Sequence, residues 1–145
     1  MRSAAGLEAT LGRVSLRMAS SLDLHDVLAE ITSGLVHDLH AAMARIWLTG
    51  PDDPDTLRLA ASAGLSTRLD GTRSRVPIGE LKIGEIARTR SPLCTNDLVG
   101  DPRFVDKAWI AANGLVTFAG YPLVFDHELL GVLAIFSRTI LEAHD

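Results

Sequence analysis

The sequence predicts an α+β fold in which a central antiparallel sheet carries helices on both of its faces. The first observation is the strand pair FAGYPLVFDHELLGVLAIFSR at residues 118–138, where two strand-forming runs flank the tight turn Asp126-His127-Glu128. The second run, residues 129–136, is apolar on both faces, so it must be covered on both sides. The second observation is the order of elements, because strand pairs separated by helix patterns are typical of an α+β sandwich.

Two helix patterns open the chain. In the first, apolar residues spaced 4-3-4 form a narrow stripe on one face, and they are Leu7, Leu11, Val14 and Met18. This stripe fits a helix packed on its own domain, or a helix that pairs with a partner chain. The second helix is expected to begin with Asp23 as its N-cap. Its buried stripe consists of Leu24, Val27, Leu28, Ile31, Leu35 and Leu39.

A strand pair follows the second helix. Residues 42–48 are expected to form one strand and residues 57–63 its hairpin partner. The segment between them, residues 50–55, is rich in Gly, Pro and Asp and predicts a loop. A polar, arginine-rich loop is then expected at residues 64–75.

The second half of the chain predicts two short helices and a short strand before the final strand pair. A helix is expected at residues 83–90 and a strand at 92–95. Asp101 as a cap and Pro102 at the first helical position predict the next helix. That helix should end near Asn113-Gly114, because glycine commonly terminates helices.

Size and composition fit one globular domain. The chain has 145 residues, of which 47% are apolar and 22% charged. Its net charge of -4 argues against nucleic-acid binding, because phosphates require a basic face. Neither a membrane span nor a signal-peptide core is visible, so a cytoplasmic location is expected. Helix patterns at both ends suggest that residues 1–145 are a single domain excised from a longer protein.

Six segments occur in an order that resembles the GAF domain family: SLDLHDVLAEI, ARIWL, LRLAASAGL, VPIGELKIGEIARTRSP, NDLVGDPRF and FAGYPLVFDHELLGVLAIFSR. The resemblance covers nearly the whole chain and implies a sensory fold with a central antiparallel sheet. The last two segments are most similar to GAF domains of bacterial sensor histidine kinases and enhancer-binding transcriptional activators. In such proteins the domain lies upstream of an output module.

Departures from the family bear on cofactors. Haem-binding relatives carry a histidine where this chain has residues 111–114, AANG, and bilin-binding relatives use a cysteine in a helical segment, unlike Cys94. Cyclic-nucleotide-binding relatives carry an N-K-F-D-E constellation that is absent at residues 137–141. No cofactor is therefore expected. The family also often has a second glycine where Leu81 stands, which makes backbone approach to a ligand less favourable there.

The resemblance implies a cavity between one face of the sheet and the irregular segment from about Leu65 to Gly114. Seven residues are predicted from this position to line a ligand pocket, and they are Trp47, Ile83, Ile86, Asp97, Phe104, Phe118 and Tyr121. A plain core position is the alternative for each of them.

Polar clusters offer weaker candidates for a metal site. His37 and His40 are three residues apart on the second helix and could share a metal, but no third ligand is near in sequence. Asn96, Asp97 and Asp101 could form a carboxylate site, but these residue types also organise loops through bonds to the backbone. No metal site is expected.

The remaining candidates are basic side chains and the single cysteine. An anion such as a phosphate could be held by the basic group Arg68, Arg73, Arg75, Lys82, Arg88 and Arg90, although a solvated loop explains them as well. Cys94 fits a small apolar strand residue better than a redox sensor.

The expected function is a non-catalytic sensory domain that binds an unknown small molecule, forms a homodimer through its N- and C-terminal helices, or does both. It would thereby control an output module in bacterial signal transduction. A purely structural dimerisation module is the first alternative. A small enzyme of the methionine sulfoxide reductase type is disfavoured, because that branch of the family uses several cysteines and this chain has one.

Overall fold

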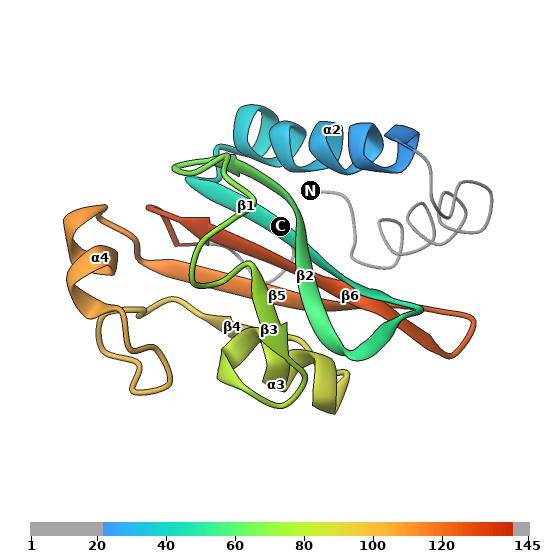
Figure 1. Cartoon of the computed structure of the whole chain (residues 1–145). Helices are drawn as coiled ribbons and strands as arrows, with labels where there is room; N and C mark the ends of the chain where they lie inside the picture. The colour runs from blue at the N-terminus through green and yellow to red at the C-terminus, as the bar shows by residue number, and fades with distance from the viewer. Residues whose placement is uncertain (1–21, 141–145) are drawn as a thin grey trace.

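The computed structural model describes residues 22–140, and their strands form one six-stranded sheet (Figure 1). The elements in chain order are α2 (Leu22–Leu39), β1 (Met43–Gly50), β2 (Asp53–Gly64), β3 (Arg75–Pro77), α3 (Leu81–Thr89), β4 (Leu93–Thr95), α4 (Lys107–Ala112), β5 (Thr117–Phe125) and β6 (Glu128–Ser137). The strand order is β3-β2-β1-β6-β5-β4, and all neighbours are antiparallel. The predicted antiparallel sheet is confirmed.

The β5–β6 hairpin forms as its sequence predicts. Its register runs from Thr117 opposite Ser137 to Phe125 opposite Glu128. The two residues between the strands have positive φ, 53° at Asp126 and 65° at His127. Two consecutive positive φ angles define the turn that matches the twist of a tight hairpin.

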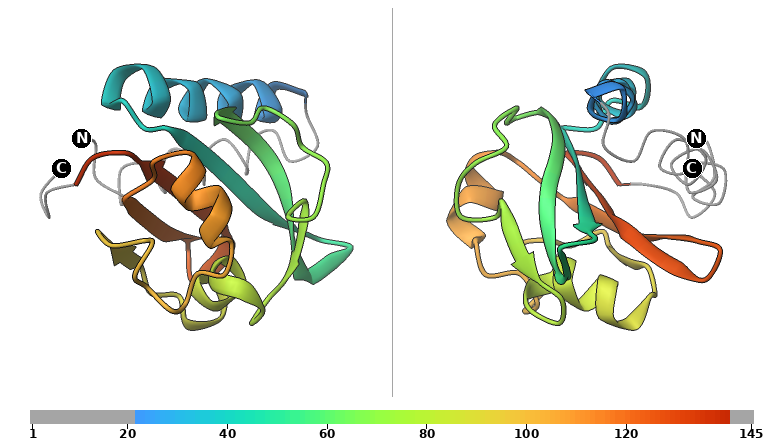
Figure 2. Two further views of the ribbon diagram at one scale, coloured as in Figure 1. Left: turned by 90° about the vertical axis from the view of Figure 1, so that its left-hand side faces the viewer. Right: turned by 45° about the vertical axis from the view of Figure 1, so that its right-hand side comes forward.

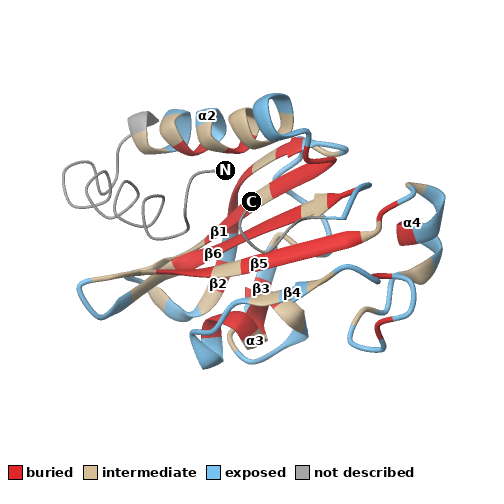
Figure 3. Cartoon of the chain, turned by 180° about the vertical axis from the view of Figure 1, so that it is seen from behind, coloured by how far each residue is buried: buried red, intermediate tan, exposed pale blue. Residues whose placement is uncertain are grey.

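The sheet buries apolar side chains on both faces. Along β6, Val132 and Ala134 belong to one core cluster, whereas Leu133 and Ile135 belong to the other, as expected from the alternation of side chains along a strand. The central strands are accordingly buried over most of their length (Figure 3). Full burial of one such aliphatic side chain stabilises the fold by roughly 1.5–3 kcal/mol.

Helices cover the two faces, which confirms the predicted layers. On one face, α2 packs on β1 and β2, with Leu28 fully buried in that cluster. On the other face, α3 contacts β5 and β6, and Ile110 of α4 joins the same core. Figure 2 shows α2 on one side of the sheet and α3 and α4 on the other.

Several boundaries differ from those predicted. The helix expected to open at Asp101-Pro102 begins at Lys107, because the Asp101 carboxylate accepts hydrogen bonds from the backbone and guanidinium of Arg103. The Lys107 ammonium donates to the Leu98 carbonyl at 2.8 Å and holds the irregular segment closed. The helix ends as predicted, at Asn113 followed by Gly114 with φ 65°.

The first half of the chain also contains corrections. β2 begins at Asp53, so the predicted loop 50–55 shrinks to a turn at residues 51–52, and β3 was not predicted. Helix α2 begins at Leu22, which places Asp23 in the first turn of the helix and not before it. The predicted first helix, with its stripe from residue 7 to residue 18, lies outside the described residues.

Candidate functional site

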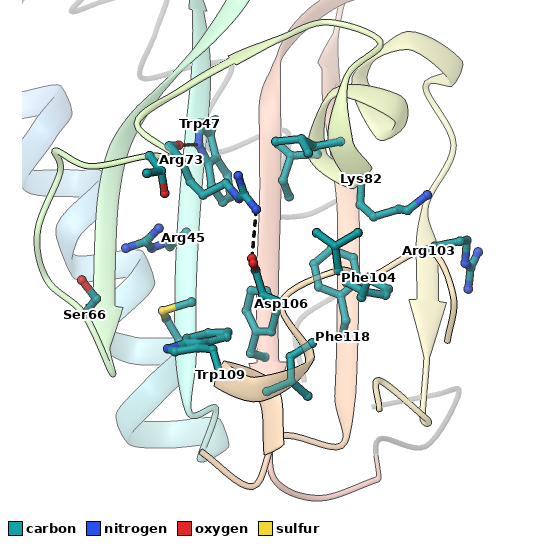
Figure 4. Close-up of a pocket in the computed structure, with 17 residues that line it drawn as sticks. Arg45, Trp47, Ser66, Arg73, Lys82, Arg103, Phe104, Asp106, Trp109 and Phe118 are labelled. Atoms are coloured by element: carbon teal, nitrogen blue, oxygen red, sulfur yellow. Dashed lines mark hydrogen bonds and ion pairs between the residues drawn. The ribbon is translucent and has the colours of Figure 1, made fainter. Parts of the chain in front are cut away.

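A cavity of about 490 Å³ lies on the face of the sheet opposite α2 (Figure 4). Its floor is the sheet. Its walls come from the β2–β3 loop, the start of α3, the segment before α4, and α4 itself. Small-molecule pockets commonly have volumes of roughly 300–1,000 Å³, so this cavity is large enough for a metabolite-sized ligand.

The floor follows from the two-residue alternation of strands. Met43, Arg45 and Trp47 of β1 point to the same face, and Phe136 of β6 and Phe118 of β5 join them there. Met43 pairs with Phe136, and Phe136 pairs with Phe118, so these three side chains form a row across three adjacent strands. The floor is therefore built on three paired strands and is mostly apolar.

Aromatic rings form a continuous group in the cavity, which we call the aromatic wall: Phe104, Phe118, Phe136 and Trp109. The ring centroids of Phe104 and Phe118 are 5.0 Å apart, those of Phe118 and Phe136 are 5.1 Å apart, and those of Trp109 and Phe136 are 5.8 Å apart. These distances and the tilted geometries are favourable for aromatic pairs. Trp109 is 39% exposed, so the wall reaches from the core to solvent.

Two interactions fix the mouth of the cavity. The Trp47 indole Nε1–H donates to the Arg73 carbonyl at 2.8 Å and ties the β2–β3 loop to the floor. The Arg73 guanidinium donates to the Asp106 carboxylate at 2.9 Å (Figure 4). This ion pair joins the β2–β3 loop to the residue that precedes α4, so the two irregular walls are linked across the mouth.

Arg45 has an unusual environment for a charged side chain. It is half-buried, and burial lowers the pKa of its guanidinium. Its Nε donates to the Ser62 hydroxyl at 2.9 Å, and that hydroxyl in turn donates to the Ser66 carbonyl. Within residues 22–140, no carboxylate forms an ion pair with Arg45. The guanidinium is therefore oriented by a neutral group and its charge is not balanced there.

The other basic groups at the cavity are Lys82 and Arg103. Arg103 binds the Asp101 carboxylate through its Nε at 2.9 Å, and this guanidinium holds the pKa of that carboxyl well below its usual range. Lys82 lies in the first turn of α3, next to Leu81. Leu81 itself has φ 59°, a left-handed conformation that costs a leucine roughly 1–2 kcal/mol.

Four of the seven predicted pocket residues lie in this cavity: Trp47, Ile83, Phe104 and Phe118. Ile86 is buried in the core beside it and does not reach the lining. Asp97 lies in a separate hollow, where its carboxylate accepts a hydrogen bond from the Gly100 backbone. Tyr121 packs on the opposite face of the sheet, because it is three residues from Phe118 along a strand with a two-residue repeat.

Arg45 and Trp109 line the cavity although neither was predicted as a pocket residue, and Arg73 was predicted only as a member of the basic group. Arg45 could have been found, because it stands two residues before Trp47 on the same strand and must share its face. Trp109 and Asp106 could not, because their positions depend on the path of the irregular segment before α4.

The polar clusters do not assemble metal ligands in the described part of the chain. Helix α2 ends at Leu39, and His40 has φ 60°, so His37 and His40 do not share a helix face. Asn96 accepts a hydrogen bond from the Thr117 hydroxyl, which is a structural contact.

The basic group is dispersed. Arg68 pairs with Asp70 and Arg88 with Glu85, while Arg90 donates to the His127 carbonyl at 2.8 Å. Cys94 is exposed on β4. The pKa of Tyr121 is raised mainly by burial of the Tyr121 side chain and also by the neighbouring Cys94.

Within residues 22–140, no helix combines the length and apolarity required to cross a membrane.

This fold and cavity define a class of small α+β domains that hold a pocket between an antiparallel sheet and the segments crossing one of its faces. The chain belongs to the GAF domain family, since the family model, described as "GAF domain", matches residues 23–145.

Curated relatives are regulatory proteins. The chain is 30% identical over 130 residues to the Nif-specific regulatory protein of Herbaspirillum seropedicae. The match covers 88% of this chain and 23% of that relative, so the chain spans about a quarter of the relative's length.

Solved structures show the same fold at lower identity. The GAF domain from a phosphoenolpyruvate-protein phosphotransferase of Coxiella burnetii has a TM-score of 0.67 at 22% identity, covering 94% of this chain and 80% of that one. Free methionine-R-sulfoxide reductase from Neisseria meningitidis, in complex with its substrate, has a TM-score of 0.63 at 19% identity, covering 95% and 77%. At these identities the similarity establishes the fold and not the activity.

Proposed function

We propose that this chain is the ligand-sensing domain of a longer bacterial regulatory protein, and that it acts by binding and not by catalysis. The observation that carries the proposal is the 490 Å³ cavity, whose floor is the sheet and whose irregular walls are joined by the Arg73–Asp106 ion pair. Similarity to part of a Nif-specific regulatory protein supports a regulatory context and a cytoplasmic location.

The proposed mechanism is a population shift. A ligand that contacts both the β2–β3 loop and α4 binds more tightly to one arrangement of these segments and stabilises it. The signal would pass to an output module through a homodimer formed by the N- and C-terminal segments, which lie outside the described residues. Haem, bilin and cyclic nucleotides are not expected as ligands, given the departures from the relatives that bind them.

Two alternatives make different predictions. A purely structural dimerisation module would bind nothing in the cavity. A reductase would need its thiol at the cavity, whereas Cys94, the chain's single cysteine, lies on the short edge strand β4 and is exposed.

The proposal is tested by a thermal-shift screen with small metabolites, because a ligand of the native state raises the melting temperature by mass action. Thr72→Trp places a large ring at the cavity, and Thr67→Trp makes the same change at an exposed residue of the same loop that does not line it. Hits should stabilise the wild type and Thr67→Trp but not Thr72→Trp. A screen in which no compound stabilises the wild type, or in which Thr72→Trp changes nothing, would contradict binding in this cavity.

A further inference from the structure

The arginine at the floor of the cavity is the starting point. Arg45 is half-buried, and its one hydrogen bond to the described residues joins Nε to the neutral Ser62 hydroxyl at 2.9 Å. A charge removed from water is costly unless an opposite charge or several hydrogen bonds compensate for it. The two terminal nitrogens, which can bind a carboxylate in parallel, have no such partner within residues 22–140.

The other charges at the cavity are already compensated or peripheral. Arg103 is bound by Asp101, and Arg73 is bound by Asp106. Lys82 is partly exposed at the start of α3, and after the hydrogen bond from Arg88 its charge also contributes to lowering the pKa of Glu85. The half-buried Arg45 guanidinium therefore remains for one anionic group, and its planar fork matches a carboxylate.

The apolar part of the cavity indicates the rest of the ligand. Both tryptophans of the chain and three of its four phenylalanines line this cavity: Trp47, Trp109, Phe104, Phe118 and Phe136. The wall formed by four of these rings is continuous, with centroid separations of 5.0–5.8 Å. Such a surface stabilises a flat, apolar ring through offset-stacked or edge-to-face contacts.

We propose that the cavity binds a small aromatic monocarboxylate, with its carboxylate on the Arg45 guanidinium and its ring against the aromatic wall. This assignment rests on the proposed function and names the class of ligand. The Asp106 carboxylate disfavours binding of this anionic ligand, because Asp106 places a negative charge at the mouth and is paired with Arg73. Ligand binding is thus linked to the Arg73–Asp106 contact that joins the two walls.

The test is isothermal titration calorimetry of the 145-residue chain with 2-naphthoate and with 2-naphthamide, its neutral analogue of similar shape. The carboxylate should bind at least about tenfold more tightly, which is the effect expected for a hydrogen-bonded charge pair. Arg45→Gln should abolish this difference, because it weakens binding of the carboxylate at least about tenfold more than binding of the amide. Arg68→Gln is the matched control, because Arg68 is exposed, is paired with Asp70 and lies outside the cavity lining.

A second variant keeps the test valid if Arg45→Gln does not fold. Asp106→Asn removes the negative charge at the mouth without removing a helix cap, since the Asp106 side chain makes no cap bond to α4. Naphthoate should bind severalfold more tightly to Asp106→Asn, and naphthamide should be unaffected. An affinity for naphthoate that stays the same or falls in this variant overturns the assignment.

The other outcomes separate this inference from the proposed function. Equal affinity for naphthoate and naphthamide, unchanged by Arg45→Gln, overturns the carboxylate assignment but leaves a ligand-binding cavity. Tighter binding of 2-naphthyl phosphate than of naphthoate also overturns it, in favour of a phosphate ligand. Failure of naphthoate to bind overturns the inference alone if the metabolite screen has hits, and overturns the proposed function too if it has none.

Discussion

Gly120 on β5 lies against Ile86 and Phe118 in the core beside the cavity, and Gly120→Ala tests how tightly that core is packed. A Cβ at this position would lie 2.4 Å from Ile86 Cδ1 and 2.8 Å from two atoms of the Phe118 ring. Both neighbours are buried, with 1% of each residue exposed, so they cannot move aside into solvent. Overpacking of this kind typically costs about 1–3 kcal/mol.

The expected loss for Gly120→Ala is about 2 kcal/mol in the free energy of unfolding, measured by urea denaturation. The corresponding fall in melting temperature is roughly 4–8 °C for a chain of this size. Gly50→Ala is the matched control, because a Cβ there meets nothing within 4 Å. It should be neutral or slightly stabilising, since alanine restricts the unfolded chain.

A double-mutant cycle identifies the clash. Ile86→Val removes the Cδ1 atom and alone should cost about 0.5–1.5 kcal/mol. If Cδ1 is the main obstacle, the double variant should be less destabilised than the sum of the single variants by about 1 kcal/mol or more, as expected for residues in contact. Strict additivity, or a Gly120→Ala variant as stable as the wild type, would refute the packing described for the core beside the cavity.

Three further variants test other parts of the structure. Leu81→Gly should raise the free energy of unfolding by about 1 kcal/mol, because glycine adopts the φ of 59° without strain. Leu81→Ala should give no such increase, and urea denaturation of both variants measures the difference. Asp101→Asn should destabilise the domain at neutral pH and progressively less at low pH: the Asp101 pKa is lowered in the folded state, so the carboxylate stabilises the fold above its unfolded pKa of about 3.9, and this contribution shrinks as pH falls toward the folded pKa. A stability gap between wild type and variant that is as large at pH 2 as at pH 7 would contradict this. Trp47→Phe should accelerate amide hydrogen exchange in residues 65–74, because it removes the hydrogen bond from the indole to the Arg73 carbonyl. Trp109→Phe should not accelerate this exchange. Equal exchange rates in both variants would show that the hydrogen bond does not anchor the loop.

Local rules predicted those parts of the fold that depend on neighbouring residues. The β5–β6 turn follows from Asp126 and His127, which both tolerate positive φ, and the apolar run of β6 follows from burial on two faces. The start of α4 was mispredicted, because Asp101 and Pro102 form a good helix-opening signal in isolation. The Arg103 side chain captures the carboxylate instead, and nothing in the local pattern reveals that competition.

The site was predicted in part for the same reason. Trp47 and Phe118 were predicted from the resemblance and lie at the cavity, because strands present alternate residues on one face. Tyr121 was predicted in the same way but lies on the other face, three residues from Phe118 on the same strand. Asp106 and Trp109 are brought to the cavity by a segment without regular structure. Its path depends on contacts such as the bond from Lys107 to the Leu98 carbonyl, which sequence periodicity cannot predict.

The most direct test of the central claim uses the two tryptophans. The chain contains only Trp47 and Trp109, and both line the cavity, so a ¹⁵N-labelled sample gives two indole N–H signals that report on this site alone. Titration with 2-naphthoate, or with a hit from the metabolite screen, should shift both indole signals saturably with one dissociation constant. Saturable binding detected by calorimetry with both indole signals unmoved would place the ligand elsewhere and contradict the assignment of this cavity as the sensory site.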